Sequence, residues 1–244
     1  KIDVSEIKLT PLTELNKKTV FKFVEDDDDY VFNVYKNATK GFLYGSQVYD
    51  ASEFTILTGE KEVIAEPFAS TVIKPLMPQF SDFITPSAYS MSDDGTTKGF
   101  DNSPRIMYNN GEKTLGSCTY YIPQQNGSGA SAFEDEFLQF SHLTSLPPGA
   151  TTAIRSDFHF GECQLLGAGT PTSINLFNLY WLPYYSELYN IDTRTMTIKV
   201  NLSPGDINTF KFYDTVMIKN RNYRVNKIDY KPNDLATVEF ILLP

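Results

Sequence analysis

Hydrophobic and polar residues alternate along several short stretches of the chain, and such alternation is typical of half-buried β-strands. It is clear at residues 19–24, 30–35 and 61–65. The first two stretches flank the consecutive carboxylates at residues 26–29, so they predict a hairpin with a solvated turn. Residues 53–57, followed after a short turn by residues 61–65, predict a second hairpin.

The C-terminal part of the chain has the same pattern in a more regular form. Strands are predicted at residues 196–202, 215–219, 223–228 and 237–243. Turns are predicted between them, at residues 203–206, 220–222 and 231–234. Short strands joined by short turns favour a small closed or nearly closed β-barrel at this end of the chain.

The middle of the sequence is rich in Gly, Ser, Asn, Asp and Pro, which favours long connections. One hairpin is predicted there, with strands at residues 105–108 and 119–122 around the Asn110-Gly111 step, because such a step supplies the positive φ of a tight turn. Residues 124–131 are polar and glycine-rich, so we expect a mobile loop. We divide the chain into an antiparallel β unit at 1–91, a loop-rich β region packed on it at 92–172, and a helix plus a small C-terminal β-barrel at 173–244.

A single helix is predicted, over residues 174–189. Ser173 offers a side-chain oxygen as its N-cap. Pro183 lies within the helix and lacks the backbone donor that a helix interior uses, so we expect a kink or a break near Leu182. Apolar and aromatic residues fill almost every position of the segment, which predicts burial on more than one side.

The composition also favours β structure. Thr, Ile and Val together number 51 and Phe, Tyr and Trp number 34 of the 244 residues, and these side chains suit a pleated, half-buried surface. We therefore predict a mainly β fold, with antiparallel sheets or small β-barrel modules and one short aromatic-rich helix.

The charge argues against two classes of partner. Lys and Arg number 21 against 30 Asp and Glu, and the formal net charge of −9 repels phosphate backbones and anionic lipid head groups. No apolar run approaches the roughly 20 residues that cross a bilayer. Residues 1–10 have no apolar core, so no signal peptide is visible. We expect neither a nucleic-acid partner nor a membrane span.

Four residues are candidate soft metal ligands, namely Cys118, His142, His159 and Cys163. Structural zinc sites bring such ligands in close pairs, and only His159 and Cys163 approach that spacing. We therefore predict buried free thiols and hydrogen-bonded imidazoles, with no metal site and no cofactor. The carboxylates at residues 26–29 lack the spacing of a calcium loop and would need ligands from elsewhere, so a solvated turn that guards a strand edge is the favoured interpretation.

We predict no catalytic residue and expect that the chain is not an enzyme. The sequence has no Gly-x-Ser-x-Gly or His-Glu-x-x-His motif and no phosphate-binding glycine loop. Residue types that hydrolytic sites use are present, namely His159 with Asp157 and Glu162, and the three acidic residues 134–136. A hydrolase that acts on cell-wall material therefore stays as a further hypothesis.

The strongest interaction candidates are aromatic residues of the predicted helix, namely Tyr180, Trp181, Tyr184 and Tyr185. Tyr and Trp are enriched at the centres of protein interfaces, so these four could form a subunit interface. Core packing between the middle region and the C-terminal barrel is the alternative that the residues leave open.

Eight segments of the chain resemble sequence patterns of a known protein family, namely residues 7–18, 21–23, 26–30, 105–111, 175–181, 192–194, 206–219 and 223–230. Together they span most of the chain and resemble the C-terminal part of large virion structural proteins of tailed bacteriophages. The last two segments, with a Ser-Pro-Gly-Asp turn before them and the Tyr223-Arg224-Val225 run within them, are also similar to the β-barrel modules of phage tail hub and baseplate proteins.

This resemblance implies a structural role in a virion. The chain would be one protomer of a homo-oligomeric ring around the tail axis and would bind other virion tail proteins. No functional residue carries over, because the matching motifs are fold motifs, and since such proteins are usually longer we expect a further portion before Lys1. Assembly would bury the aromatic helix, or the loops at residues 92–102 and 124–132, between subunits.

The 34 aromatic residues also support a second hypothesis. In that hypothesis the chain is a receptor- or glycan-binding β module at a virion or cell surface. Binding to a glycan array that a single aromatic-to-alanine change abolishes would favour it over assembly.

Overall fold

The computed structural model describes residues 2–11, 14–77, 80–86, 90–91, 94, 96–98, 102–116, 119–122, 132–144, 156–161, 163 and 173–244. The chain is mainly β, with 44% strand and 16% helix, and its sheets are antiparallel, which confirms the predicted fold class. Within these residues, no helix combines the length and the apolar character that crossing a membrane requires.

Contacts between residues divide the chain into two compact units, which are described separately. Unit 1 consists of Lys1–Lys17, Ala51–Gly59 and Trp181–Pro244, and unit 2 consists of Lys18–Asp50 and Glu60–Tyr180. By sequence, unit 1 has 11 Lys and Arg against 11 Asp and Glu, whereas unit 2 has 10 against 19, so the whole net charge of −9 belongs to unit 2. The domain limits predicted after residues 91 and 172 stay a prediction.

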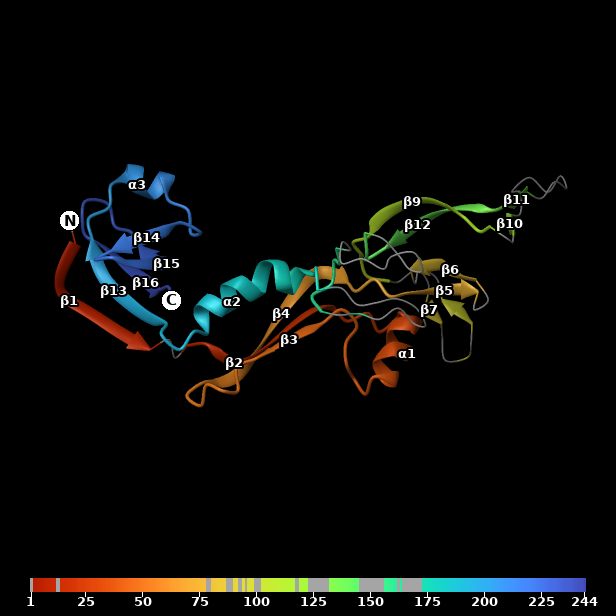
Figure 1. The fold of residues 1–244 in the computed structure, drawn as a ribbon, viewed down its shortest axis with the longest axis horizontal. Helices are drawn as coiled ribbons and strands as arrows, with labels where there is room; N and C mark the ends of the chain where they lie inside the picture. The colour runs from red at the N-terminus through yellow and green to blue at the C-terminus, as the bar shows by residue number, and fades with distance from the viewer. Residues whose placement is uncertain are drawn as a thin grey trace. The chain divides into compact units, whose positions relative to one another are not determined.

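Unit 1 is built on one five-stranded sheet (Figure 1). Its strand order is β1 (Ile2–Pro11), β13 (Arg194–Val200), β16 (Ala236–Leu242), β15 (Arg221–Asp229) and β14 (Thr215–Ile218). All neighbouring pairs are antiparallel. The four C-terminal strands closely match the predicted ones, but nothing in their sequence indicated that β1 joins them.

The predicted small barrel does not close. Antiparallel pairing reverses the direction at each step, so in an order of five strands the first and the last run the same way. β1 and β14 therefore cannot form a further antiparallel pair with each other. The sheet stays open, with these two strands at its edges.

One face of this sheet buries a continuous hydrophobic core. Alternate residues of three strands supply its buried side chains, namely Met196, Ile198, Tyr223, Val225, Ala236, Val238 and Phe240. A period of two is expected for a sheet that buries one face.

A short helix, α3 (Pro204–Thr209), begins where a turn was predicted. Ser203 and Asp206 form a capping box: the Asp206 N–H donates to Ser203 Oγ at 3.2 Å, and the Ser203 N–H donates to Asp206 Oδ2 at 2.8 Å. Pro204 fits the first helical position, where a backbone donor would have no helical partner. These turn-forming residues are therefore also a helix start.

The main sheet of unit 2 has the order β3 (Gln47–Asp50), β2 (Asn16–Val24) and β4 (Thr58–Ala69), of which the residues from Lys18 and Glu60 onward belong to the unit. The strands predicted at residues 19–24 and 61–65 are confirmed. Residues 53–57 lie outside any strand, so the second predicted hairpin is wrong.

Residues 30–35 belong to the helix α1 (Tyr30–Ala38) and not to the predicted strand. The Asp29 side chain accepts the N–H groups of Val31 at 2.9 Å and Phe32 at 3.1 Å, so it caps the helix. Apolar residues at 30, 32 and 34 fit an alternating strand, whereas those at 31, 32 and 35 fit one helix face. The cap decides between the two.

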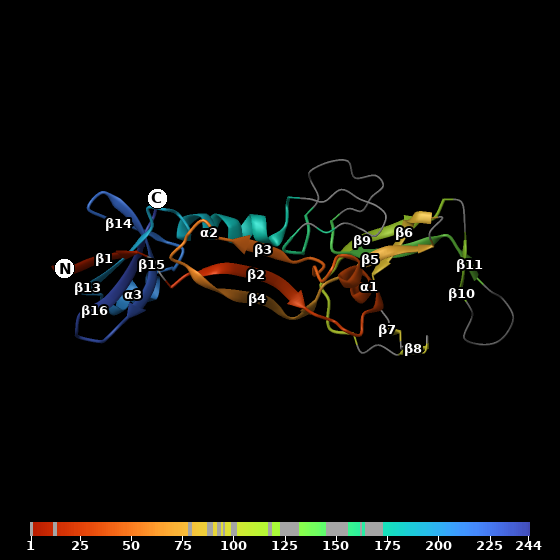
Figure 2. The ribbon, with the colours of Figure 1, turned by 90° about the horizontal axis from the view of Figure 1, so that it is seen from below.

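The rest of the unit 2 strands form two-stranded pairs (Figure 2). These are β5 (Ile73–Met77) with β6 (Phe80–Pro86), β7 (Ser90–Met91) with β8 (Thr97–Lys98), β9 (Tyr108–Thr114) with β12 (Glu136–Ser141), and β10 (Tyr120–Ile122) with β11 (Ala132–Glu134). Figure 1 shows β10 and β11 continuing the β9–β12 pair, and β12 also contacts β6.

The hairpin predicted around Asn110-Gly111 is not formed, because both residues lie inside β9, which pairs with β12. Gly111 has a φ of 78°, its N–H donates to Asn109 Oδ1 at 2.9 Å, and the register of the pair shifts between Leu138 and Phe140. The positive φ therefore serves a β-bulge and not a turn. The loop predicted at residues 124–131 lies outside the described residues.

Two of the four consecutive carboxylates are buried, which corrects the predicted solvated turn. Asp26 is 5% exposed and Asp29 is 0% exposed. Arg105 Nη2 donates to Asp26 Oδ2 and to Asp29 Oδ2, each at 2.8 Å. Only Asp27 and Asp28 are exposed. This ion-pair triad joins the start of α1 to the segment before β9, and it supplies the positive charge that the buried carboxylates require.

Candidate functional site

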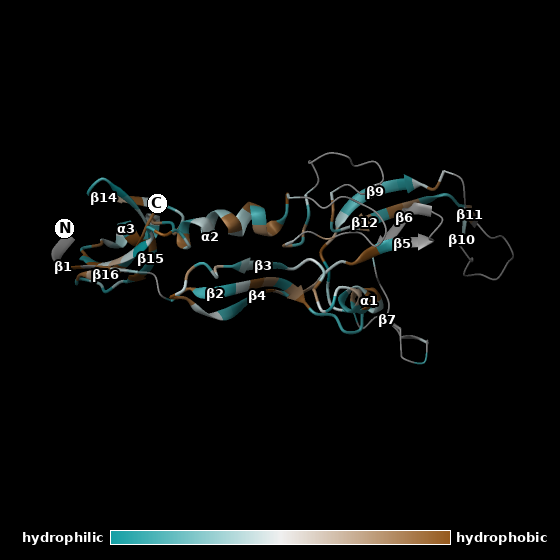
Figure 3. Cartoon of the chain, turned by 60° about the horizontal axis from the view of Figure 1, so that its bottom comes forward, coloured by the Kyte–Doolittle hydropathy of each residue, from teal (hydrophilic) through white to brown (hydrophobic). Residues whose placement is uncertain are grey.

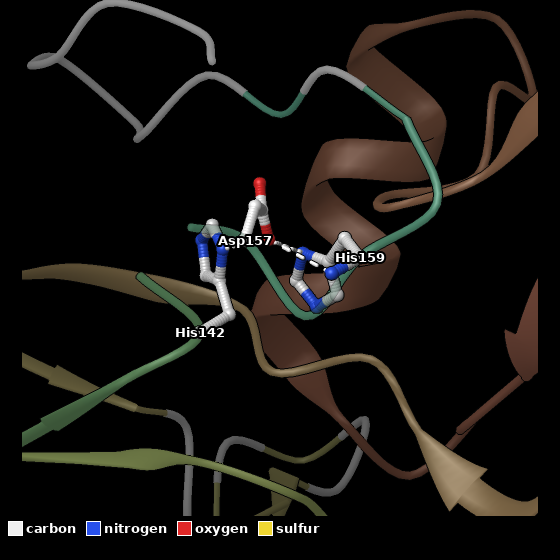
Figure 4. Close-up of side chains that lie close together, drawn as sticks. All are labelled: His142, Asp157 and His159. Atoms are coloured by element: carbon white, nitrogen blue, oxygen red, sulfur yellow. Dashed lines mark hydrogen bonds and ion pairs between the residues drawn. The ribbon is translucent and has the colours of Figure 1, made fainter. Parts of the chain in front are cut away.

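A buried polar cluster in unit 2 contains residue types that metal and catalytic sites use. His142 is 0%, His159 1% and Asp157 4% exposed, and one potential ligand atom of each lies within 4.8 Å of the others (Figure 4). His142 directly follows β12, and Asp157 and His159 lie in the segment at residues 156–161. The sequence analysis named all three residues but did not bring His142 together with Asp157.

Backbone hydrogen bonds position the cluster. Leu143 and Asp157 form an isolated antiparallel bridge, and the Phe158 N–H donates to the His142 carbonyl at 3.0 Å. Gly45 adjoins the other side, where a Cβ would lie 2.7 Å from His159 Cγ. Gly45 also has a φ of 77°, so glycine is required there by both its conformation and its surroundings.

His142 is held by two partners. Its Nδ1 lies 2.9 Å from Asp157 Oδ1, and its Nε2 lies 3.0 Å from the Tyr44 hydroxyl. An ionised carboxylate only accepts hydrogen bonds, so Nδ1 carries the proton and donates it to Asp157. Nε2 then accepts the hydroxyl proton of Tyr44.

His159 has the same tautomer for a different reason. The Thr71 N–H donates to His159 Nε2 at 3.2 Å, so in the neutral ring the proton lies on Nδ1. Nδ1 is 3.3 Å from Cys163 Sγ and 3.6 Å from Asp157 Oδ1. The two imidazole rings stack, with their centroids 4.1 Å apart.

Burial sets the charge states of the cluster. Burial, together with the charge of His142, lowers the pKa of His159 to about 3. Burial alone would raise the pKa of Asp157, but the hydrogen bond from His142 and the charges of both histidines outweigh it, so this pKa is lowered. Burial and the charge of Asp157 raise the pKa of the Cys163 thiol well above its ordinary range. At neutral pH the cluster therefore contains a carboxylate, a neutral His159 and a thiol.

The cluster does not fit a metal ion. His142 lies beside His159 and Cys163, although only the latter two are close in the sequence, and Cys118 lies outside the described residues. A metal on His159 Nδ1 would require the proton on Nε2, where it would face the Thr71 N–H as a second donor. The Nε2 lone pair is already used. The geometry is that of hydrogen-bonded imidazoles and a buried thiol, which is what the sequence analysis expected.

The same hydrogen bonds bear on the hydrolase hypothesis. A histidine that activates a thiol must present a nitrogen lone pair to it, but the His159 nitrogen that faces Cys163 carries a proton. His159 is also 1% exposed. Glu162, the third residue of that hypothesis, lies outside the described residues. The arrangement supports a structural role for the cluster.

The aromatic helix begins later than predicted and has two parts, the π-helix η1 (Phe177–Trp181) and the α-helix α2 (Leu182–Leu188). Asn175 Oδ1 accepts the Asn178 N–H at 2.8 Å, so Asn175 and not Ser173 caps the start. The helix type changes between Trp181 and Leu182, directly before Pro183, but the helix continues, so the kink or break predicted near Leu182 stays a prediction.

The structure separates the four predicted interface residues. Tyr180 is 70% and Tyr184 is 38% exposed, Trp181 is half-buried, and Tyr185 is 7% exposed. The Tyr185 ring lies 6.2 Å from the Trp181 ring and stacks on Tyr189 at 5.4 Å. Hydrophobic and hydrophilic positions alternate along the helix (Figure 3), so the expected burial on more than one side is wrong. Tyr185 is a core residue, and the interface role of the others stays a prediction.

An apolar groove on unit 1 was not predicted. It has a volume of about 530 Å³ and is lined by Ile7, Leu9, Met196, Ile198, Met217, Ile218, Lys219, Arg221 and Tyr223. Its floor consists of core side chains, whereas Leu9 on β1 is 52% and Met217 on β14 is 71% exposed. The groove is thus the opening between the two edge strands. Sequence reasoning missed it because it did not place β1 in this sheet.

The packing of Gly45 against the cluster predicts a large effect of a single methyl group. Gly45→Ala should destabilise unit 2 by about 1–3 kcal/mol more than Gly41→Ala. Gly41 is a matched control, since its φ is 93° but nothing lies within 4 Å of its Cβ position. Urea unfolding followed by circular dichroism measures both variants, and equal losses would contradict the packing described here.

The lowered pKa of His159 predicts a pH dependence of stability. Between its ordinary pKa of 6.5 and about 3, the unfolded chain binds a proton that the folded chain does not. The free energy of unfolding should therefore fall as the pH drops below about 6.5, by up to about 1.4 kcal/mol per pH unit for this group. The lowered pKa of Asp157 adds a loss in the same direction at lower pH. Urea unfolding of the wild type and of His159→Gln measures it, and an NMR titration of the folded chain with His159 near its ordinary pKa would contradict it.

Comparison with known proteins gives no relative for this chain. No family model matches it, and neither the curated proteins nor the solved structures contain a significant match.

Proposed function

We propose that the chain is a structural protein that acts by symmetric self-assembly and by binding neighbouring proteins. The proposed setting is the tail of a bacteriophage, in a hub, baseplate or tail-associated ring, and this setting rests on the resemblance described above. The observation that carries the assembly proposal is the apolar groove between β1 and β14.

The groove places exposed apolar side chains beside the core of the sheet. Its floor includes Met196, Ile198 and Tyr223, each 5% exposed or less, and the exposed Leu9 and Met217 flank it. Covering Leu9 and Met217 removes apolar area from water, which favours binding of another chain. Within the described residues, the edges of β1 and β14 also have unpaired backbone groups, which favour the addition of another strand.

The buried cluster also supports this proposal, because its polar groups are already paired within the chain. His142, Asp157, His159 and Cys163 are paired with one another and with Tyr44 and Thr71. They contribute to the packing of unit 2. The features that remain for function are surfaces, which is what an assembling protein requires.

Self-assembly predicts that a charge in the groove weakens association. Met217→Glu should raise the dissociation constant of the oligomer about tenfold or more, which corresponds to about 1.4 kcal/mol. Ile191→Glu is the matched control, because Ile191 is 77% exposed in the same unit but does not line the groove. Sedimentation velocity of the purified chain over a wide concentration range measures both variants.

The particle itself provides the second readout. Purified tailed particles should contain the polypeptide in a copy number that is a multiple of the ring symmetry. A wild-type chain that stays monomeric at every concentration, and is absent from such particles, would contradict the proposed function.

A further inference from the structure

The groove in unit 1 lies beside the two edge strands β1 and β14. Within the described residues each of them pairs on one side only, β1 with β13 and β14 with β15. The other edge of each strand can take a further antiparallel strand.

The lining of the groove specifies the chemistry of that strand. Seven of the nine lining residues are apolar and the other two are Lys219 and Arg221. Both cations are exposed, and in the described part of the chain neither lies within ion-pair distance of a carboxylate. A strand with an apolar side chain toward the core and carboxylates toward these two cations would match both the apolar lining and the charge of the groove.

The chain contains a segment of this chemistry in unit 2. It is the stretch at residues 133–136, which we name the acidic strand, with the sequence Phe133-Glu134-Asp135-Glu136. It runs from the end of β11 to the start of β12. Phe133 is 70% exposed and the three carboxylates are also exposed. β11 pairs with β10 on one side only, so within the described residues its other edge is unpaired.

Within one copy, the carboxylates of the acidic strand repel one another. The charge of Glu112, followed by those of Asp135 and Glu134, raises the pKa of Glu136, which reports repulsion among neighbouring carboxylates. The whole net charge of −9 lies in unit 2, while unit 1 is neutral. Contacts between the unit 2 surfaces of two copies are therefore repulsive, and contacts of unit 2 with the basic rim of unit 1 are not.

We propose that β11 of one copy, which carries Phe133 and Glu134 of the acidic strand, adds through its unpaired edge to β14 of unit 1 in the next copy, beside the groove. This inference rests on the proposed self-assembly and names the two surfaces that carry it. Phe133 packs against the floor of the groove, and Glu134 and Glu136 lie near Lys219 and Arg221. The contact is heterologous, so repetition gives a closed ring or a filament according to the rotation between copies.

Charge reversal tests this contact in the full chain. Arg221→Glu alone and Glu134→Arg alone should each raise the dissociation constant of the oligomer by about tenfold or more, since each places like charges across the contact. An equimolar mixture of the two variants should recover assembly to within a few fold of the wild type, because each chain then offers the partner that the other lacks. Sedimentation velocity and native mass spectrometry measure all four samples.

Two further charge reversals serve as controls. Lys227→Glu and Asp28→Lys change exposed residues of unit 1 and unit 2 that lie outside the groove and the acidic strand. Both should leave assembly within about twofold of the wild type. Each variant is first shown to be folded by its circular dichroism spectrum and its urea midpoint.

The outcomes separate this inference from the proposed function. Loss in the single variants and recovery in their mixture supports the contact. A wild type that assembles, with single variants that assemble equally well or a mixture that does not recover, overturns the contact and leaves self-assembly standing. A wild type that stays monomeric at every concentration overturns the contact, and its absence from tailed particles as well overturns the proposed function. Binding of a glycan array that Phe133→Ala abolishes, with assembly unchanged, also overturns the contact and favours the receptor-binding hypothesis.

Discussion

The alternating direction of antiparallel strands is the constraint on which the account of unit 1 depends. Five strands leave β1 and β14 pointing the same way, so the sheet cannot close by one more antiparallel pair. The groove lies at this opening, where the buried Met196 and Tyr223 form a floor beside the exposed Leu9 and Met217. An even number of strands would let the two edges pair with each other in antiparallel fashion. With five, the two edges keep backbone groups that suit a strand of another copy.

Unit 2 buries residues of the types that form metal and catalytic sites, namely His142, His159, Asp157 and Cys163. The Thr71 N–H fixes the tautomer of His159, and therefore places a proton on the nitrogen that faces Cys163. This one backbone donor keeps His159 from presenting a lone pair to the thiol. The Asp26–Arg105–Asp29 triad is a second case, in which two buried carboxylates pair with a guanidinium of the chain itself.

The sequence predicted those elements whose signals are local. Short turns separate β14, β15 and β16, so these strands were found. Other signals were ambiguous between two local structures. Residues 30–35 fit a strand and a helix face equally, and Asp29 reads as a turn residue until its hydrogen bonds show that it is a cap. The Asn110-Gly111 step supplies a positive φ, which a bulge uses as readily as a turn.

Long-range contacts had no signal that one sequence could provide. β1 pairs with β13, which lies near the other end of the chain. Thr71 contacts His159, which is far from it in the sequence, and hydrophobic periodicity carries information only about neighbouring positions. The groove and the buried cluster both depend on such contacts. For this reason the residue types of the cluster were identified correctly, whereas their arrangement and the groove appeared only in the structure.

The proposed contact covers the free edge of β14 with a strand of another copy. Hydrogen–deuterium exchange of the backbone amides, measured at concentrations below and above assembly, tests it most directly. The amides of β14 should become protected on assembly, while those of α3 should not change. Assembly that leaves the edge amides of β14 exchanging as fast as in the monomer would contradict the contact.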